Sequence, residues 1–198
     1  MPKIVYAPIL EQAGFLKRKA ADVVEQWVAQ LDGAMQSWQL TESINLIAGD
    51  KVRFKYKSST TASSSIKAFY SRDTNYFPLV SLRSDGAYTV NAGAIKIDGV
   101  DYQEGEQAPI DGEYHEIEHT LTTNASISLL GAGWISFSEK TTLWHLDSAL
   151  LNFEVERASE IIHQIPLTNK SQGATQLATV GDINAFMPNY TDAVWRKP

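Results

Sequence analysis

The chain has 198 residues, of which 43% are apolar and 20% are charged, so it can bury a sizeable core and is not disordered as a whole. A formal net charge of −6 argues against a nucleic-acid binder, and the absence of cysteine excludes disulfides and thiolate sites. Neither a signal-peptide pattern nor an apolar run of 18 residues is present, so we predict a protein that is neither exported by such a signal nor embedded in a membrane.

The first part of the chain predicts an extended arm followed by one amphipathic helix. Residues 1–8 contain two prolines and little periodicity, whereas residues 15–31 carry apolar residues at spacings of three and four. Asp32-Gly33 is a typical helix end. The apolar stripe packs either on the rest of the chain or against a partner or further copies of the chain, and both readings stay open. Its members are Phe15, Leu16, Ala20, Val23, Val24, Trp27, Val28 and Leu31.

After Met35 the helical period disappears, and short β-rich runs separated by turn residues indicate an antiparallel sandwich or barrel. In the run 51–57, apolar and cationic residues alternate, which is the pattern of a half-buried strand. Asn, Asp and Gly between later runs are typical of hairpin turns. The predicted strands are Ser37–Leu40, Ile44–Ile47, Lys51–Lys57, Ile66–Tyr70, Phe77–Leu82, Tyr88–Val90, Ala94–Ile97, Val100–Tyr102, Tyr114–Leu121, Ala125–Leu130, Trp134–Ser138, Leu143–Val155, Glu160–Leu167 and Val194-Trp195, with a loop-rich stretch at Thr168–Tyr190.

No motif of this sequence predicts a catalytic site. His115 and His119 lie four apart in a strand, about 13 Å along it, which is too far for one metal ion. Glu116 and Glu118 share a strand face at about 6.6 Å, the best available acid/base pair, yet any solvated strand face gives this spacing. There is no zinc-hydrolase, nucleophile-elbow or phosphate-loop motif. We therefore expect no enzyme, no catalytic residue and no metal ligand.

Most aromatic residues fit inward-facing positions of a sandwich, including Trp38, Phe54, Phe69, Trp134, Phe137 and Phe153. The polar loop after the fourth strand is different, because its side chains are not needed for packing. Loops carried on a rigid scaffold are common binding sites. We therefore predict ligand-binding residues in this loop, namely Arg72, Asp73, Asn75 and Tyr76.

Three stretches, taken in order, resemble concanavalin A-like (laminin-G-like) jelly rolls. Residues 44–54, with Gly49-Asp-Lys-Val-Arg-Phe54, resemble the opening strand pair of those domains; residues 84–99 resemble their central meander; and Asp111-Gly-Glu-Tyr-His115 resembles their Asp-Gly-x-Trp-His strand. The end of the chain, residues 165–195, is similar to the corresponding segment in virion proteins of tailed bacteriophages.

The resemblance implies two domains: an N-terminal arm and helix over residues 1–36, for attachment or oligomerisation, and a jelly-roll β-sandwich over residues 37–198. It also implies a non-enzymatic tail, fibre or capsid-surface protein of a virion, made in the host cytoplasm. We expect a homo-oligomer that contacts other virion proteins or its own copies through Phe15, Leu16, Val23, Val24, Trp27, Val28 and Leu31. The sandwich would bind a host-surface glycan or protein. No cofactor is expected; family members often bind Ca²⁺ at loops, and although no Asp and Asn cluster here clearly matches such a loop, the resemblance leaves Ca²⁺ open. The alternatives are a free carbohydrate-binding module or lectin and, more weakly, a jelly-roll glycoside hydrolase or lyase.

Overall fold

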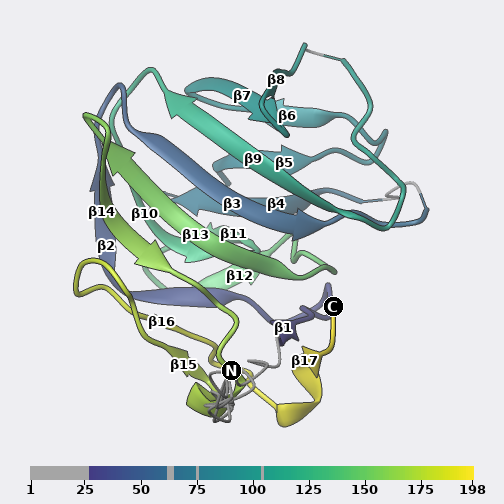
Figure 1. The fold of residues 1–198 in the computed structure, drawn as a ribbon, viewed down its shortest axis with the longest axis vertical. Helices are drawn as coiled ribbons and strands as arrows, with labels where there is room; N and C mark the ends of the chain where they lie inside the picture. The colour runs from purple at the N-terminus through teal and green to yellow at the C-terminus, as the bar shows by residue number, and fades with distance from the viewer. Residues whose placement is uncertain (1–26, 62–64, 75, 104) are drawn as a thin grey trace, which may run out of the picture.

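The computed structural model describes residues 27–198 except 62–64, 75 and 104, and this part of the chain is mainly β (Figure 1). Its strands form two large antiparallel sheets. One sheet has the order β15 (Thr175–Gln176), β16 (Ala185–Phe186), β2 (Trp38–Leu46), β10 (Ala125–Leu130), β4 (Lys67–Arg72), β5 (Pro78–Leu82) and β6 (Tyr88–Val90). The other has the order β14 (Glu160–Ile165), β13 (Leu150–Arg157), β3 (Lys51–Lys57), β9 (Tyr114–Leu121), β7 (Gly93–Ile97) and β8 (Val100–Asp101).

Smaller elements complete the described chain. Two short antiparallel pairs are β1 (Val28–Ala29) with β17 (Trp195–Arg196) and β11 (Gly133–Ser136) with β12 (Thr141–Leu143). The helical elements of the described residues are two single turns, η1 (Lys170–Gln172) and η2 (Asp192–Val194).

The two large sheets lie one in front of the other (Figure 1) and share one apolar core, so the architecture is like that of a β-sandwich. Aromatic rings connect them: Phe69 of β4 lies 5.4 Å from Phe54 and 4.8 Å from Tyr56 of β3, between ring centroids. Burial of such rings is the largest apolar contribution to a core of this kind. The inward positions predicted for Trp38, Phe54, Phe69, Trp134 and Phe153 are confirmed, whereas Phe137 is only partly buried.

Strand β3 shows how the sequence produces the layers. Its apolar residues Val52, Phe54 and Tyr56 are at most 1% exposed, while the cationic residues between them face outward. Strand β9 pairs with it along its whole length, with Phe54 opposite Ile117, and alternates in the same way. A period of two residues therefore assigns every side chain of the pair to the core or to solvent.

Most predicted strands agree with the observed ones to within two residues at either end. Two differ. The predicted runs 37–40 and 44–47 belong to one strand, β2. Its pairing with β10 shifts register between them: Ile127 lies opposite Ile44, whereas Leu129 lies opposite Gln39. The predicted strand 143–155 is divided, because the chain between β12 and β13 turns at residues 144–149 and buries Leu146 and Ala149 outside any strand.

The predicted helix over 15–31 falls mostly outside the described residues, but its last residues are described and are not helical. Val28 and Ala29 form β1, which pairs with Arg196 and Trp195 near the end of the chain. The backbone N–H of Gln30 then donates to the carbonyl of Val194 at 2.9 Å. Here pairing with a distant strand overrides a local apolar spacing that also suits a helix. The predicted closing strand is confirmed as β17, shifted by one residue.

Candidate functional site

The loop predicted to bind a ligand begins at the end of β4, and two of its residues hold it to its neighbours. Arg72 Nη2 donates to the Thr123 hydroxyl at 3.0 Å. The Asp73 carboxylate accepts hydrogen bonds from the hydroxyls of Ser126 and Ser128 on β10. Arg72 and Asp73 therefore have bonding partners within the chain, whereas the sequence suggested that they were unneeded for the structure.

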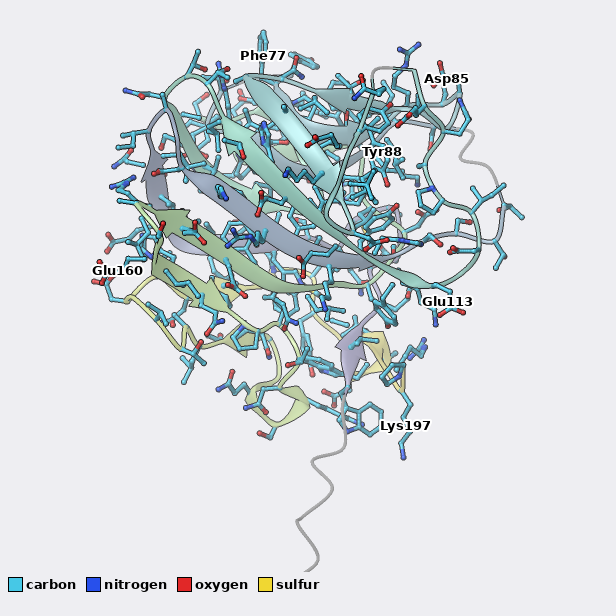
Figure 2. All side chains as sticks on the ribbon, turned by 45° about the horizontal axis from the view of Figure 1, so that its top comes forward. Phe77, Asp85, Tyr88, Glu113, Glu160 and Lys197 are labelled. Carbon is cyan, nitrogen blue, oxygen red and sulfur yellow. The ribbon has the colours of Figure 1, made fainter. Side chains whose placement is uncertain are left out.

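Tyr76, by contrast, is 57% exposed and has a positive φ of 58°. Its backbone N–H donates to the Trp134 carbonyl at 2.8 Å, and its ring meets Trp144 edge-on at 6.3 Å. The adjacent Phe77 is 53% exposed and projects from the surface (Figure 2). Asn75 lies outside the described residues. Of the four predicted residues, Tyr76 is thus the one with a largely exposed side chain among those described.

The predicted attachment residues divide in the same way. Phe15, Leu16, Val23 and Val24 lie outside the described residues. Val28 and Leu31 are 5% and 1% exposed and belong to the core of the chain itself, so their side chains face no partner here. Trp27 packs partly against that core, with Lys170 Nζ 3.5 Å from the centre of its ring.

Glu116 and Glu118 lie on the outer face of β9, opposite the inward-facing histidines of the same strand. Glu118 binds Arg53 Nε at 2.7 Å, and Glu116 lies 3.8 Å from Lys55 Nζ. Partial burial opposes ionisation of Glu118, but the hydrogen bonds and charges of Arg53 and Lys51 together outweigh it and lower the pKa of Glu118. A general acid needs a raised pKa, so Glu118 is poorly suited to that role.

A cavity of about 630 Å³ lies at one end of the two sheets. Its wall comes from the residues that follow β3, the turn that precedes β9 and the segment that precedes β13. Hydroxyl groups dominate that wall, and the charged side chains around it are two cations and two anions. The hydroxyl residues are Ser58, Ser59, Thr60, Thr61, Ser65 and Ser148; the charged residues are Lys57, Lys67, Asp111 and Asp147.

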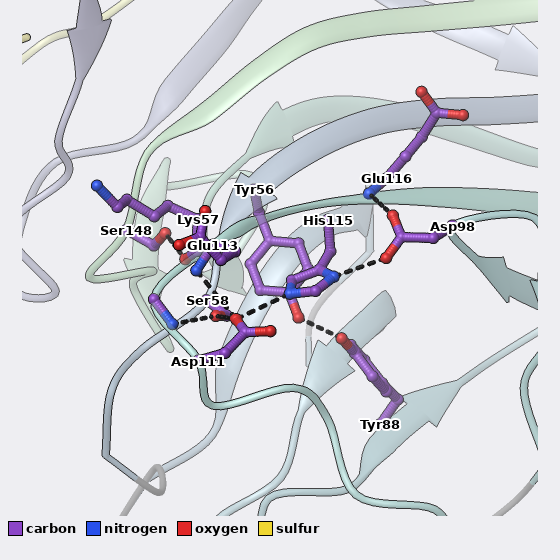
Figure 3. A network of polar contacts seen from close by, with 11 residues as sticks. Tyr56, Lys57, Ser58, Tyr88, Asp98, Asp111, Glu113, His115, Glu116 and Ser148 are labelled. Carbon is purple, nitrogen blue, oxygen red and sulfur yellow. Dashed lines mark hydrogen bonds and ion pairs between the residues drawn. The ribbon is translucent and has the colours of Figure 1, made fainter. Parts of the chain in front are cut away.

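A histidine between two carboxylates supports this wall (Figure 3). His115 Nδ1 lies 2.7 Å from Asp98 Oδ2, and His115 Nε2 lies 3.0 Å from Asp111 Oδ1. Asp98 belongs to the turn between β7 and β8, and Asp111 to the turn before β9. The Asp111 carboxylate also accepts a hydrogen bond from the Ser58 hydroxyl at 2.6 Å. The cluster therefore joins three separate segments beside the cavity.

The charges of this cluster stabilise one another. Burial disfavours the imidazolium of His115, but the hydrogen bonds to Asp111 and Asp98 outweigh burial and raise its pKa. Hydrogen bonds from Ser58 and His115 hold the pKa of Asp111 well below its ordinary value. Burial opposes ionisation of Asp98, yet the Glu116 backbone N–H and His115 lower its pKa. The cluster thus favours two carboxylates and one imidazolium.

Two tyrosine hydroxyls lie beneath the cluster, where Tyr56 and Tyr88 bond to each other from opposite sheets (Figure 3). Burial, with smaller effects from the charges of Asp111 and Asp98, raises the pKa of Tyr56 to about 12. The nearby Ser58 hydroxyl donates its hydrogen bond to the Asp111 carboxylate rather than to a histidine. This differs from a nucleophilic triad, in which a histidine base accepts the serine proton.

Sequence reasoning missed this cluster. The Asp98-Gly99 pair read as a hairpin turn, and Asp111 to His115 as a strand motif of the jelly-roll resemblance, with no contact predicted among them. The signal that was available is that Asp111 and His115 are four residues apart at a turn-to-strand junction. Asp98 could not be added to them without the pairing of β7 with β9.

No family model, curated protein or solved structure matches this chain in the comparisons made. Over the described residues, no helix is long and apolar enough to cross a membrane. Nor do those residues contain a group of three or more His, Asp or Glu side chains arranged to hold a metal ion. The virion setting therefore stays a prediction, and binding of Ca²⁺ stays open.

Proposed function

We propose that the protein is a non-enzymatic, lectin-like jelly roll whose polar cavity binds a hydroxyl-rich ligand, namely a glycan with no net charge. The observation that carries this proposal is the hydroxyl-dominated wall of the cavity between the Ser58–Thr61 segment and Asp147-Ser148. Its volume of about 630 Å³ lies within the range of about 300–1,000 Å³ that small-molecule sites occupy.

The chemistry of the wall supports a neutral sugar. Sugar hydroxyls both donate and accept hydrogen bonds, and serine and threonine hydroxyls do the same. Lys67 Nζ lies 3.3 Å from Asp147 Oδ2, so these charges balance within the wall itself. A strongly anionic ligand would meet no excess of positive charge here, and a strongly cationic ligand no excess of negative charge.

The test is retention on a glycan array, followed by calorimetric titration with each sugar that is retained. Asp147→Asn removes a charged acceptor whose side chain is 60% exposed, so the fold should survive the change. We expect it to weaken binding about tenfold, the effect of about 1.4 kcal/mol. The matched control is Asp101→Asn, an exposed aspartate paired with Lys96 away from the cavity, which should leave the affinity unchanged. An array without a retained glycan would overturn the proposal.

The setting that we propose is the virion of a tailed phage, with the sandwich presented outward and the N-terminal segment attached to the particle or to other copies. It rests on the resemblance of residues 165–195 to virion proteins of tailed phages, together with the ordered resemblance of residues 44–54, 84–99 and 111–115 to concanavalin A-like jelly rolls. Because Val28 and Leu31 belong to the core, the chain to test against the full protein is one lacking residues 1–26 only. We expect light scattering to show fewer copies per assembly for that chain than for the full-length protein. Equal oligomeric states would refute this role for the segment.

A further inference from the structure

The geometry around His115 requires a charged imidazole. Both ring nitrogens lie within hydrogen-bonding distance of carboxylate oxygens, at 2.7 Å to Asp98 and 3.0 Å to Asp111. An ionised carboxylate only accepts hydrogen bonds, whereas a neutral imidazole has one N–H and one lone pair. A neutral His115 would therefore turn a lone pair towards a carboxylate oxygen, and only the imidazolium satisfies both contacts.

The two carboxylates differ in what else binds them. Asp98 uses its second oxygen to accept the Glu116 backbone N–H at 2.9 Å, and its contact with His115 is the shorter one. Asp111 makes its contacts with His115, the Ser58 hydroxyl and the Glu113 N–H through the single oxygen Oδ1. When His115 loses a proton, the shorter contact keeps the remaining N–H, and the contact with Asp111 is the one released.

Asp111 connects this event to the cavity. Asp111, Gly112 and Ser58 all line the cavity, and the Ser58 hydroxyl oxygen also accepts the Gly112 N–H at 2.9 Å. The described residues between β8 and β9 form no regular strand or helix, although the Ala108 N–H donates to the Gly86 carbonyl at 2.8 Å. Asp111 also accepts hydrogen bonds from Ser58 and from the Glu113 N–H, but of its three partners His115 is the one that titrates near neutral pH.

We propose that His115 is a pH-sensitive latch that holds the Asp111 wall of the cavity in its ligand-binding position when protonated and releases it when deprotonated. The ligand readout rests on the proposed function; the latch itself does not. Release follows because the neutral ring offers Asp111 a lone pair in place of a donor, so the carboxylate keeps its hydrogen bonds from Ser58 and Glu113 but loses the one that ties it to the His115 ring.

The groups facing His115 allow a defined titration. Asp98 comes from the β7–β8 turn, Asp111 from the turn before β9, and the Tyr56 ring from β3 at 6.1 Å between ring centroids. Tyr88 of β6 contacts the cluster through the Tyr56 hydroxyl. The pKa of Tyr56 is about 12 and that of Tyr88 is higher, so neither tyrosine ionises where histidine does. Both aspartates have lowered pKa values and remain charged above pH 6.

The first test needs no ligand. In the full-length protein, NMR follows the His115 ring and the backbone amides of Gly112 and Glu113 between pH 5.5 and 9, about the range in which histidine titrates. We expect a His115 midpoint above 6.5, with the two amides shifting at that same midpoint. Asp98→Asn should lower the midpoint, because one of the two carboxylates then carries no charge. The control is His163→Gln, which leaves the His115 titration unchanged.

The second test follows a glycan retained on the array. We expect its affinity to fall about fivefold or more from pH 6 to pH 9 in the natural protein, and less than about twofold in His115→Gln. A His115 midpoint at or below 6.5, or amides that do not follow it, would overturn the latch. A glycan that binds equally at both pH values would also overturn it and leave the proposed function standing. Failure of every glycan would remove the proposed function alone, since the NMR titration still decides the latch.

Discussion

Acid should destabilise the fold through one buried histidine, His119. Its side chain is fully buried between the sheets; Nδ1 faces the Tyr70 hydroxyl, and Nε2 has no hydrogen-bond partner among the described residues. Among the described residues no carboxylate offsets the cost of burying a charged ring, so burial lowers the pKa of His119 to about 4. Protonation of this ring in the folded protein therefore requires a charge in an apolar core.

The magnitude follows from linkage. The folded chain takes up this proton near pH 4 and the unfolded chain near 6.5, so between these values the unfolded chain binds more protons. Each pKa unit corresponds to about 1.4 kcal/mol. The free energy of unfolding should thus fall by about 3 kcal/mol as the pH drops from 7.5 to 4, with no effect of His119 above neutrality.

The assay is urea unfolding, followed by tryptophan fluorescence at several pH values, for the natural protein and His119→Leu. The leucine variant removes the titrating group, and carboxylates contribute equally to both proteins. Its absolute stability will differ, because the Tyr70 hydroxyl loses its partner. The informative quantity is therefore the difference between the two free energies of unfolding. From pH 7.5 to pH 4, the natural protein should lose about 3 kcal/mol more stability than the variant. Parallel curves would refute the reasoning.

Two further predictions concern stability at neutral pH. Gly93→Ala should cost about 1–3 kcal/mol in urea unfolding, because the added Cβ would lie 2.1 Å from the Thr120 carbonyl oxygen, a backbone atom that moves little; an unchanged midpoint would contradict this packing. Asp50→Ala should cost about 2 kcal/mol, because the buried carboxylate accepts hydrogen bonds from Arg157 and from the Ile47 N–H. The matched control, Asp101→Ala, breaks only an exposed ion pair and should change stability by less than about 0.5 kcal/mol.

Strand positions could be predicted from the sequence wherever one face of the strand is buried and the other is exposed to solvent. The bounds of β3 and β9 agree with the predicted ones because their alternation is uninterrupted over at least seven residues. At Val28 and Leu31 local spacing was misleading, because the same apolar residues suit a helix or a short strand covered by the rest of the chain. What decides between them is β17, more than 160 residues away, which no local pattern contains.

The site was harder to predict for a related reason. Polar loop residues were taken as free for a ligand, yet Asp73 accepts hydrogen bonds from two serines of β10. The partners of His115 come from two turns brought to it by sheet pairing. Short-range sequence signals predict strands and turns well, whereas the partners of a charged side chain depend on which strands lie side by side.

The position of the early strands has a consequence for how the chain is made. Strand β2 lies between β10 and β16, and β3 lies between β13 and β9, so each sheet has an early strand flanked by late ones. Pairing between strands so distant in the sequence makes folding slow, because the entropy cost of closing long loops comes before the contacts that stabilise them. While the chain is still being synthesised, both edges of β2 and β3 lack their final neighbours. Such unpaired edges are sites of aggregation, so the yield of this protein should depend on how well they are protected until the last residues have left the ribosome.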